Sequence, residues 1–263
     1  MAETGRLTPA PAAILNVSPV LLLRIAIITT IVVVWEAVAA SGLLFRDVVP
    51  SLFTIGAAIA TILLDPDYYR HLWITLAEVA TAMMIGGSLG LAAGLALGAN
   101  RFLSEAFERY LYYLGPTPKI IFFPIMIMWF GVGPGSKIAL GALSCFFPIA
   151  LSAAAGMRQI DQVLIKVGRS FRANTWQMVR KIYLPAMREP VLNGVRLGLG
   201  VAIIGTLLAE TKLSNRGVGF LVINSYATFN MPRMYALLVI LFVLAIGANA
   251  LLGRFSAFHT LRK

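Results

Sequence analysis

Charged side chains are scarce in this sequence. They make up 13% of the residues, whereas a soluble domain carries about 25%. Hydrophobic residues account for 59%, and several apolar runs reach the roughly 20 residues that a helix needs to cross a bilayer. This composition excludes an ordinary soluble domain and predicts an all-α polytopic membrane protein with six transmembrane helices.

Groups suited to catalysis are also few. The single cysteine, Cys145, excludes an internal disulfide, and the two histidines, His71 and His259, stand apart from other ligand-type residues. A phosphate-binding loop ends in Gly-Lys-Ser/Thr, and the nearest stretch, 131–137, lacks the Gly-Lys pair. We therefore expect a chain that is not an enzyme, has no metal site and holds no cofactor of its own.

The basic residues gather in one polar stretch, 157–196, which we call the elbow. It contains only two acidic residues, Asp161 and Glu189. Its eight basic residues are Arg158, Lys166, Arg169, Arg172, Arg180, Lys181, Arg188 and Arg196. Because this charge adjoins apolar runs, the net charge of +11 predicts contact with a membrane surface and not with nucleic acid.

The apolar residues of the elbow predict two short helices joined by a bend. One helical face is formed by Ile160, Val163, Leu164, Val167 and Phe171. Asn174, three residues before Gln177, has the spacing of a capping box that starts a second helix, and Pro185 is expected to end it. An alternative interpretation is an amphipathic loop that lies on anionic lipid headgroups.

Six apolar segments predict the spans. They cover about 20–40, 72–98, 119–130, 138–156, 191–210 and 234–252, with an interfacial helix at 52–64 and a glycine-rich polar loop at 212–233. The predicted domain extends over 20–256, between a flexible tail at 1–19 and a short tail at 257–263. An even number of spans puts both termini on one side. That side receives 16 of the 22 basic residues, so the termini and the elbow are predicted to be cytoplasmic.

Four glycines recur every four residues in the second span. Gly86, Gly90, Gly94 and Gly98 share one helix face, which would let a neighbouring backbone approach closely. General tolerance of small residues is the alternative, but it explains one such pair better than four in register.

Three acidic residues fall within predicted spans, and one of them, Glu36, lies near the outer end of the first span. Glu78 and Glu210 are costly near the bilayer centre, by roughly 2.5–3.5 kcal/mol each on insertion scales. One interpretation places them along a substrate pathway or gate. The other is a structural hydrogen bond to a Ser, Thr or Asn of another span. Arg196, at the start of the fifth span, can extend its charge to the interface and is predicted to be structural.

Several short motifs resemble those of the permeases of binding-protein-dependent ABC importers, in particular the branch that imports sulfonates, taurine and nitrate. The motifs are Gly-Leu-Ala-Leu-Gly at 94–98, Pro-Thr-Pro at 116–118, Met-Trp-Phe-Gly-Val-Gly at 128–133, Ser-Lys-Ile at 136–138, Phe-Phe-Pro-Ile at 146–149, Ile-Tyr-Leu-Pro at 182–185, Gly-Val-Arg-Leu at 194–197, Ala-Glu at 209–210 and Arg-Gly-Val-Gly at 216–219. The elbow occupies the position of the family's coupling loop. The resemblance extends from about residue 49 through the sixth span.

The resemblance implies a type I importer permease in a bacterial inner membrane. Its partners would be a dimer of ABC ATPases that bind ATP and Mg²⁺, a second permease (identical or different) and an external solute-binding protein. The solute would be a small anion such as a sulfonate or nitrate. Coupling to the ATPase would use the loop at about 157–190, namely Val163, Lys166, Val167, Gly168, Arg169, Ser170, Phe171, Arg172, Ala173, Asn174 and Trp176.

The elbow departs from the family pattern at two places. The family has Glu-Ala-Ala where this chain has Lys166-Val167-Gly168, and it has glycine where this chain has Arg172. An arginine makes a sharp bend costlier or differently shaped. Either the chain pairs with a different permease that keeps the usual loop, or the ATPase surface has changed to match.

Two functions outside the importer class remain as alternatives. An ion-coupled secondary transporter would act without an ATPase, and it would be expected to show internal repeats, of which we find no clear example. A membrane scaffold with no pathway would not need the elbow.

Overall fold

The computed structural model describes residues 19–42 and 48–260, and every regular element in those ranges is helical. The structure consists of two compact units, Met1–Thr54 and Ile55–Lys263, so one domain over 20–256 stays a prediction. Of the predicted tails, 1–18 and 261–263 lie outside the described residues, and residues 257–260 belong to the last helix.

The all-α class with long apolar helices is confirmed. The long helices in the described ranges are α1 (Pro19–Ser41), α3 (Pro66–Ala99), α7 (Pro134–Arg158), α11 (Arg188–Lys212) and α13 (Met231–Thr260), and the short ones are α2 (Leu52–Leu64), α4 (Arg101–Leu103), η1 (Ser104–Glu108), α5 (Arg109–Leu114), η2 (Lys119–Phe122), α6 (Phe123–Phe130), α8 (Gln162–Ser170), α9 (Thr175–Met178), η3 (Val179–Tyr183), α10 (Leu184–Ala186) and α12 (Val218–Ala227). Five of these are long and apolar enough to cross a membrane. A bent pair, Arg101–Leu114 and Lys119–Phe130, brings the number to six when it is counted as one span, which we call the bent span, and its two parts make an angle of 95°.

In the first unit, Glu36 joins α1 to the following turn. Its carboxylate accepts a hydrogen bond of 2.6 Å from the backbone N–H of Leu52, the first residue of α2. The indole of Trp35 donates to the carbonyl of Pro50 over 3.0 Å. Both side chains therefore bond to backbone groups in the turn that leads into α2.

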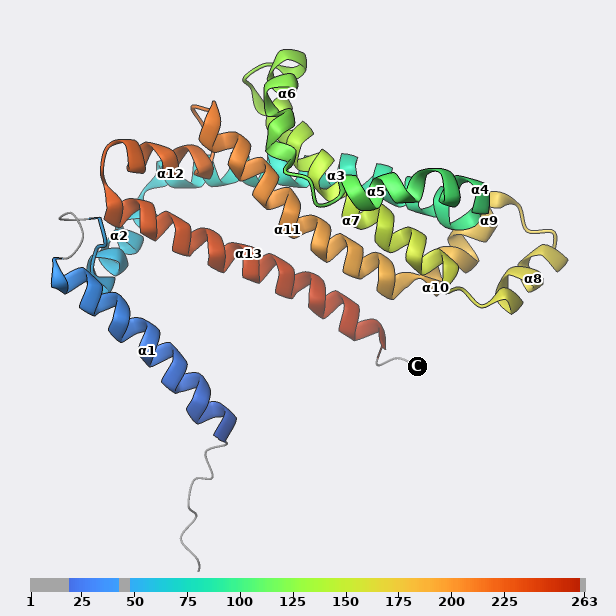
Figure 1. Ribbon diagram of the computed structural model, residues 1–263, viewed down its shortest axis with the longest axis horizontal. Coiled ribbons are helices and arrows are strands. Elements are labelled where there is room, and N and C mark those ends of the chain that lie inside the picture. Colours follow the sequence, from blue (N-terminus) through green and yellow to red (C-terminus); the bar gives the residue numbers. More distant parts are fainter. Residues whose placement is uncertain (1–18, 43–47, 261–263) are drawn as a thin grey trace, which may run out of the picture. The chain divides into compact units, whose positions relative to one another are not determined.

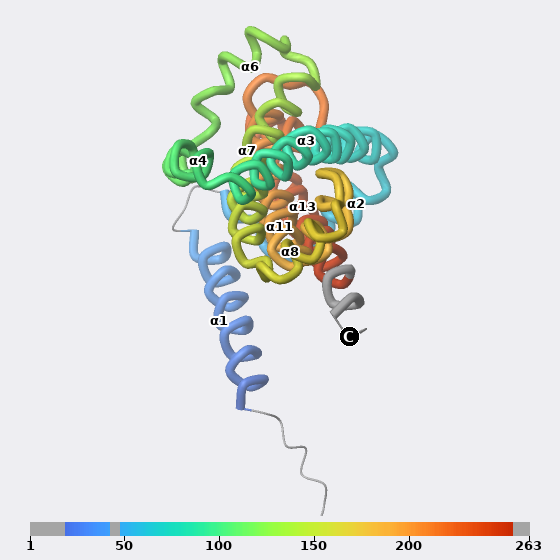
Figure 2. The backbone as a smooth tube through the Cα atoms, turned by 90° about the vertical axis from the view of Figure 1, so that its right-hand side faces the viewer, coloured from blue at the N-terminus to red at the C-terminus, as the bar shows by residue number. Residues whose placement is uncertain are grey.

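In the second unit, α7 is the central helix. It packs against both α3 and α11, and α13 packs on α11. Figure 1 shows α7 and α11 side by side, and Figure 2 shows these helices clustered when viewed nearly along their length. The elbow, with α8 and α9, lies at the end of this unit opposite α12 (Figure 1).

The glycine face of α3 lies against α7. A Cβ added at Gly86, Gly90, Gly94 or Gly98 would run into α7 at successively later turns, near Ala142, Phe146, Ala150 and Met157 respectively. Residue numbers rise together on both helices, so α3 and α7 run parallel. The contacts are backbone to backbone, for example 2.7 Å from a Cβ at Gly90 to the carbonyl oxygen of Phe146. Only glycine permits this approach.

A second small-residue face, which our sequence analysis did not identify, lies on α11. A Cβ at Gly198 would meet Ile149 of α7 at 2.7 Å, and one at Gly205 would meet the Ser144 hydroxyl at 2.7 Å. The contacts move backward along α7 as α11 advances, so these two helices are antiparallel. The regular spacing of Gly194, Gly198 and Ala202 was the available signal.

Two local predictions are wrong. The stretch 212–233 is not a plain loop, because it contains the ten-residue helix α12. Pro185 does not end the helix before it, since the helical backbone continues through η3 into α10. The helical run ends one residue after the proline, at Ala186, and Met187 separates it from α11.

The close α3–α7 contact generates a stability prediction. Gly90→Ala should lower the stability of the folded protein by about 1–3 kcal/mol, because the new methyl group overpacks against the Phe146 carbonyl. The measurement is the apparent unfolding temperature of the purified protein in detergent.

Gly87→Ala is the matched control on the same helix. Its Cβ would lie 3.5 Å from the Ile149 side chain, an ordinary contact, and alanine favours the helix by about 1 kcal/mol over glycine. Equal effects of the two substitutions would show that α3 and α7 do not approach as described.

Candidate functional site

The elbow is a helical hairpin closed over a glycine. Asp161 caps α8, accepting a hydrogen bond of 2.8 Å from the N–H of Val163. Gly168, near the end of α8, is buried, and a Cβ there would lie only 2.6 Å from the sulfur of Met178 on α9 and would also collide with Ile182. A larger residue at position 168 would therefore have to displace the ends of these two side chains.

Arg172 forms the bend of this hairpin in a left-handed conformation, with φ of 50°. The N–H of Ala173 donates to the carbonyl of Gly168 over 3.1 Å, and the N–H of Arg172 donates to that of Arg169 over 2.9 Å. These two bonds define a Schellman motif, whose left-handed residue is usually glycine. The bend is therefore formed without the glycine of the family pattern, at the energetic cost of a side chain in this region.

The second helix of the elbow begins with the predicted capping box. The Asn174 side chain accepts from the N–H of Gln177 over 2.8 Å, and the Gln177 side chain accepts from the N–H of Asn174 over 2.9 Å. Both exchanges are local, which is why the spacing alone was sufficient to predict them.

The apolar face predicted for the elbow divides into two parts. Ile160 is buried against Met157 and Met187 in the core. The remaining members, Val163, Leu164, Val167 and Phe171, are exposed, as is Trp176. Phe171 has 83% of its surface exposed. Four apolar side chains at the tip of a charged hairpin thus have no cover from the described residues of this chain.

The base of the elbow is fixed to the first half of the bent span, Arg101–Leu114. Arg158, the last residue of α7, donates to both carboxylate oxygens of Glu108, at 2.6 Å for the Nη2–Oε1 pair. The same guanidinium donates to the hydroxyl of Ser104 over 3.2 Å, and that hydroxyl donates to Glu108. A bidentate pair of this kind holds geometry better than a single contact does.

At the opposite end of the second unit, Glu210 is fully buried. Its carboxylate accepts a hydrogen bond of 2.7 Å from the hydroxyl of Thr75 on α3 and one of 2.6 Å from the N–H of Gly219 on α12. This arrangement corresponds to the alternative interpretation of Glu210, a hydrogen bond between spans. The pathway role stays a prediction.

Side chains of the same cluster accept hydrogen bonds from the other free N–H groups at the start of α12. The N–H of Val218 donates to the Thr75 hydroxyl over 2.8 Å, and the N–H of Gly217 donates to Nδ1 of His71 over 3.0 Å. These N–H groups have no partner within the helix, and a carboxylate at a helix N-terminus is favourable. A Cβ at Gly217, which has φ of 98°, would collide with the Glu210 carboxylate, so glycine is required there.

Glu78 and Lys137 lie beside this cluster. Both are buried, with 5% and 3% of their surfaces exposed, and both interact electrostatically with Glu210. The Lys137 ammonium donates to the carbonyls of Val132 and Gly133. Oε2 of Glu78 has no hydrogen-bond partner among the described residues. Neither Glu78 nor Glu210 lines the cavity between α7 and α11.

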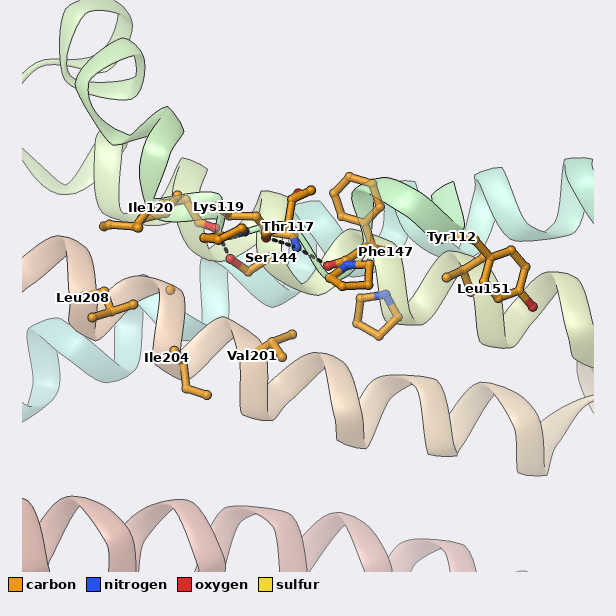
Figure 3. A pocket seen from close by; sticks show the side chains of 16 residues that line it. Tyr112, Thr117, Lys119, Ile120, Ser144, Phe147, Leu151, Val201, Ile204 and Leu208 are labelled. Atoms are coloured by element: carbon orange, nitrogen blue, oxygen red, sulfur yellow. Dashed lines mark hydrogen bonds between the residues drawn. The ribbon is translucent and has the colours of Figure 1, made fainter. Parts of the chain in front are cut away.

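That cavity, which we call the α7–α11 cavity, has a volume of about 510 Å³. It is bounded by the segment 112–120, by α7 and by α11, and Figure 3 labels Val201, Ile204 and Leu208 on α11, which belong to its lining. Its walls are mostly apolar. A volume of this size is in the range of sites that bind small molecules, roughly 300–1,000 Å³.

Lys119 is the one charged residue among those that line this cavity in the described part of the chain. Its ammonium donates to the carbonyls of Gly115 and Thr117 and lies 4.9 Å from the ring centre of Phe147 (Figure 3). Our sequence analysis used Lys119 only as the start of the third span and missed this position, because the fold around the break at 115–118 decides it.

Arg196 has a structural contact on α11. Its Nε donates to the side-chain oxygen of Asn249 on α13 over 3.1 Å. This polar bond joins two long apolar helices.

Comparisons with known proteins agree with this architecture. Residues 86–258 match the family model described as "Binding-protein-dependent transport system inner membrane component". The chain is 30% identical to the putative aliphatic sulfonates transport permease protein SsuC of Bacillus subtilis, over 80% of this chain and 76% of the relative.

Two further relatives and one solved structure are also similar. The taurine transport system permease protein TauC of Escherichia coli is 29% identical over 90% of both chains. The bicarbonate transport system permease protein CmpB of Synechococcus elongatus is 27% identical over 90% of this chain and 87% of its own length. A chain from inward-facing structures of the MetNI methionine ABC transporter superposes with a TM-score of 0.63 at 22% identity, covering 71% of this chain and 93% of that chain. This likeness confirms the fold.

The cluster around Glu210 generates a prediction at Thr75. Thr75→Val keeps the shape of the side chain but removes the hydroxyl, leaving Glu210 Oε1 and the N–H of Val218 unpaired. Each such buried group should cost about 1–3 kcal/mol of folding stability. Thermal unfolding of the purified protein measures the loss.

Thr81→Val is the control, because Thr81 lies on the same helix but is exposed and bonds only to its own helix, at the Ala77 carbonyl. Its unfolding temperature should stay near that of the wild type. A Thr75 variant as stable as the Thr81 variant would mean that α12 is not held through Thr75.

The left-handed bend generates a second prediction. Arg172→Gly should stabilise the closed elbow, because glycine avoids the roughly 1–2 kcal/mol that a side chain costs in this conformation. Hydrogen exchange of the bonded amides of Arg172 and Ala173 should slow by a factor of about 5–30.

Arg172→Ala separates strain from charge. It removes the guanidinium but keeps a Cβ, so it should not slow exchange at these amides. If alanine and glycine slow exchange equally, the relevant feature of position 172 is its charge and not its backbone conformation.

Proposed function

The chain belongs to the family of binding-protein-dependent transport system inner membrane components, and from this premise we propose that it carries a small anion into the cell, driven by a separate ATPase that docks on the elbow. Membership makes the chain a multi-pass membrane permease that works with other subunits. The subunit that we propose as its partner at the elbow is the ATPase, and the contact residues are those at the elbow tip.

The exposed apolar tip of the elbow carries the docking proposal. Phe171 and Trp176 protrude at the end of α8 and the start of α9. Apolar side chains in such a position are energetically favourable only when a partner covers them, and large aromatic side chains dominate the binding energy of most interfaces. The surrounding basic residues would contribute to orientation more than to affinity.

The rigidity of the elbow supports a mechanical role. Gly168 packs under Met178 and Ile182, and the Schellman motif fixes the bend. Arg158 joins the base of the elbow to the first half of the bent span at Glu108. A force applied at Phe171 would therefore reach α7 and the bent span without being lost in a flexible loop.

The side of the membrane follows from charge. The elbow holds eight basic residues against two acidic ones, and positive loops remain in the cytoplasm. In this orientation both termini are cytoplasmic, and α12 lies toward the outer side, where a solute-binding protein would deliver its solute.

The proposed solute class rests on the relatives. The permeases SsuC, TauC and CmpB are named for aliphatic sulfonates, taurine and bicarbonate. These solutes share an anionic group. A small anion is therefore the solute that we propose for this chain.

A substitution at the elbow tip tests the coupling. Phe171→Asp should abolish solute uptake into vesicles that contain the complete transporter, because burying an aromatic ring contributes about 1.5–3 kcal/mol, which corresponds to a roughly tenfold to hundredfold weaker ATPase association. Wild-type uptake should require ATP and should continue when ion gradients are dissipated. Normal ATP-driven uptake by Phe171→Asp would refute the docking role.

Two controls accompany this experiment. Phe171→Leu keeps an apolar tip and should retain uptake. In vesicles that contain the permease without the ATPase, Phe171→Cys should react with a membrane-impermeant maleimide only when the vesicles are inside-out, which tests the orientation. Cys145 is buried and should stay unreactive. Uptake that follows an ion gradient without ATP would instead favour a secondary transporter, and two permease types in the purified complex would favour a heterodimer.

A further inference from the structure

The α7–α11 cavity contains a positive charge without a negative partner. Lys119 is partly buried, and no acidic side chain among the described residues lies within ion-pair distance of it. The carbonyls of Gly115 and Thr117 accept hydrogen bonds from the ammonium, but they carry only partial charge. Removing an ammonium from water is costly unless an anion compensates it.

The enclosed acidic side chains of the second unit lie away from this cavity. Glu210 and Glu78 are enclosed near Lys137 and the start of α12, and Glu108 is bound to Arg158. Neither arrangement reaches the cavity wall. No acidic side chain among the described residues that line the cavity therefore compensates the charge of Lys119.

The remaining surface of the cavity is apolar. Ile120, Leu151, Val201, Ile204 and Leu208 line it together with the ring of Phe147. The Ser144 hydroxyl in its wall donates to its own helix, at the Leu140 carbonyl. A small inorganic ion that must be solvated on every side finds few donors here, whereas a solute with one charged end and an apolar body is matched at both ends.

From these observations we infer that the α7–α11 cavity is the solute site of this permease, that Lys119 binds the anionic head group, and that the solute is an organic anion whose apolar body lies against Val201, Ile204 and Leu208. This inference rests on the proposed transport function and narrows it. It names the recognising residue and favours organic sulfonates or carboxylates over bicarbonate or nitrate.

A binding measurement without nucleotide tests the inference. The complete transporter is placed in lipid nanodiscs, and equilibrium binding of benzenesulfonate is compared with that of benzenesulfonamide, which has the same body but no charge. Benzenesulfonate should bind more tightly. Lys119→Gln should weaken benzenesulfonate about tenfold to a hundredfold, the usual effect of losing a charge-assisted hydrogen bond, and should leave benzenesulfonamide unchanged.

Four further variants keep the result interpretable. Lys119→Arg retains the charge and should retain binding. Lys212→Gln removes an exposed lysine outside the cavity and should have no effect. Ile204→Glu adds a negative charge at a position that is already 57% exposed, so it should weaken benzenesulfonate binding, while Ile204→Gln should do so much less. The Ile204 pair answers the question even if the Lys119→Gln protein does not fold.

Several results would overturn the inference. These are absence of wild-type benzenesulfonate binding at millimolar concentration, equal binding of the charged and neutral probes, and full binding by both Lys119→Gln and Ile204→Glu. Because the measurement needs no ATP, any of these with intact ATP-driven uptake would refute the site alone. Loss of ATP-driven uptake by the wild type would instead refute the proposed function.

Discussion

The close approach of three helix backbones is the constraint on which the second unit depends. Lipid chains are as apolar as leucine, so helices in a bilayer gain little from hiding apolar surface and associate through packing and hydrogen bonds. In this protein α7 is held between two glycine-bearing faces, one on α3 with Gly90 at its centre and one on α11 with Gly198 and Gly205. Larger residues on those faces would separate the helices and remove the contacts that replace a hydrophobic driving force.

That packing makes the buried polar cluster at Glu210 necessary, and it also brings together the side chains that satisfy the buried groups. α12 begins inside the protein, where water cannot satisfy its first N–H groups, so side chains from α3 and α11 must accept from them. Thr75, His71 and Glu210 do so because the bundle places them next to one another. The glycines at 217 and 219 follow from the same geometry, since a Cβ at either would occupy the volume of the Glu210 side chain.

Features that depend on neighbouring residues in the sequence were predictable. The capping box of Asn174 and Gln177, the glycine periodicity of α3 and the apolar lengths of the spans each follow from local chemistry, and the structure contains all three. Features that depend on distant residues were not. The bond between Thr75 and Glu210 joins residues 135 positions apart, and neither residue indicates the other. The helix α12 was missed for the same reason, because its capping groups come from elsewhere in the chain.

Arg172 and Lys119 show the two ways in which sequence patterns mislead. At Arg172 an unfavourable residue suggested a different bend, but the hydrogen bonds to Gly168 and Arg169 hold the left-handed conformation regardless. Local propensity is a weak term when several backbone bonds oppose it.

Lys119 shows the opposite error, since a lysine beside an apolar run was taken only as the start of the third span. The break at 115–118 turns the chain so that this charge lies against Phe147 in an apolar cavity. A protein that encloses its acids near α12 and at the elbow base, yet places a partly buried cation against the apolar wall of a cavity, leaves the charge of that cation to be compensated by a bound anion.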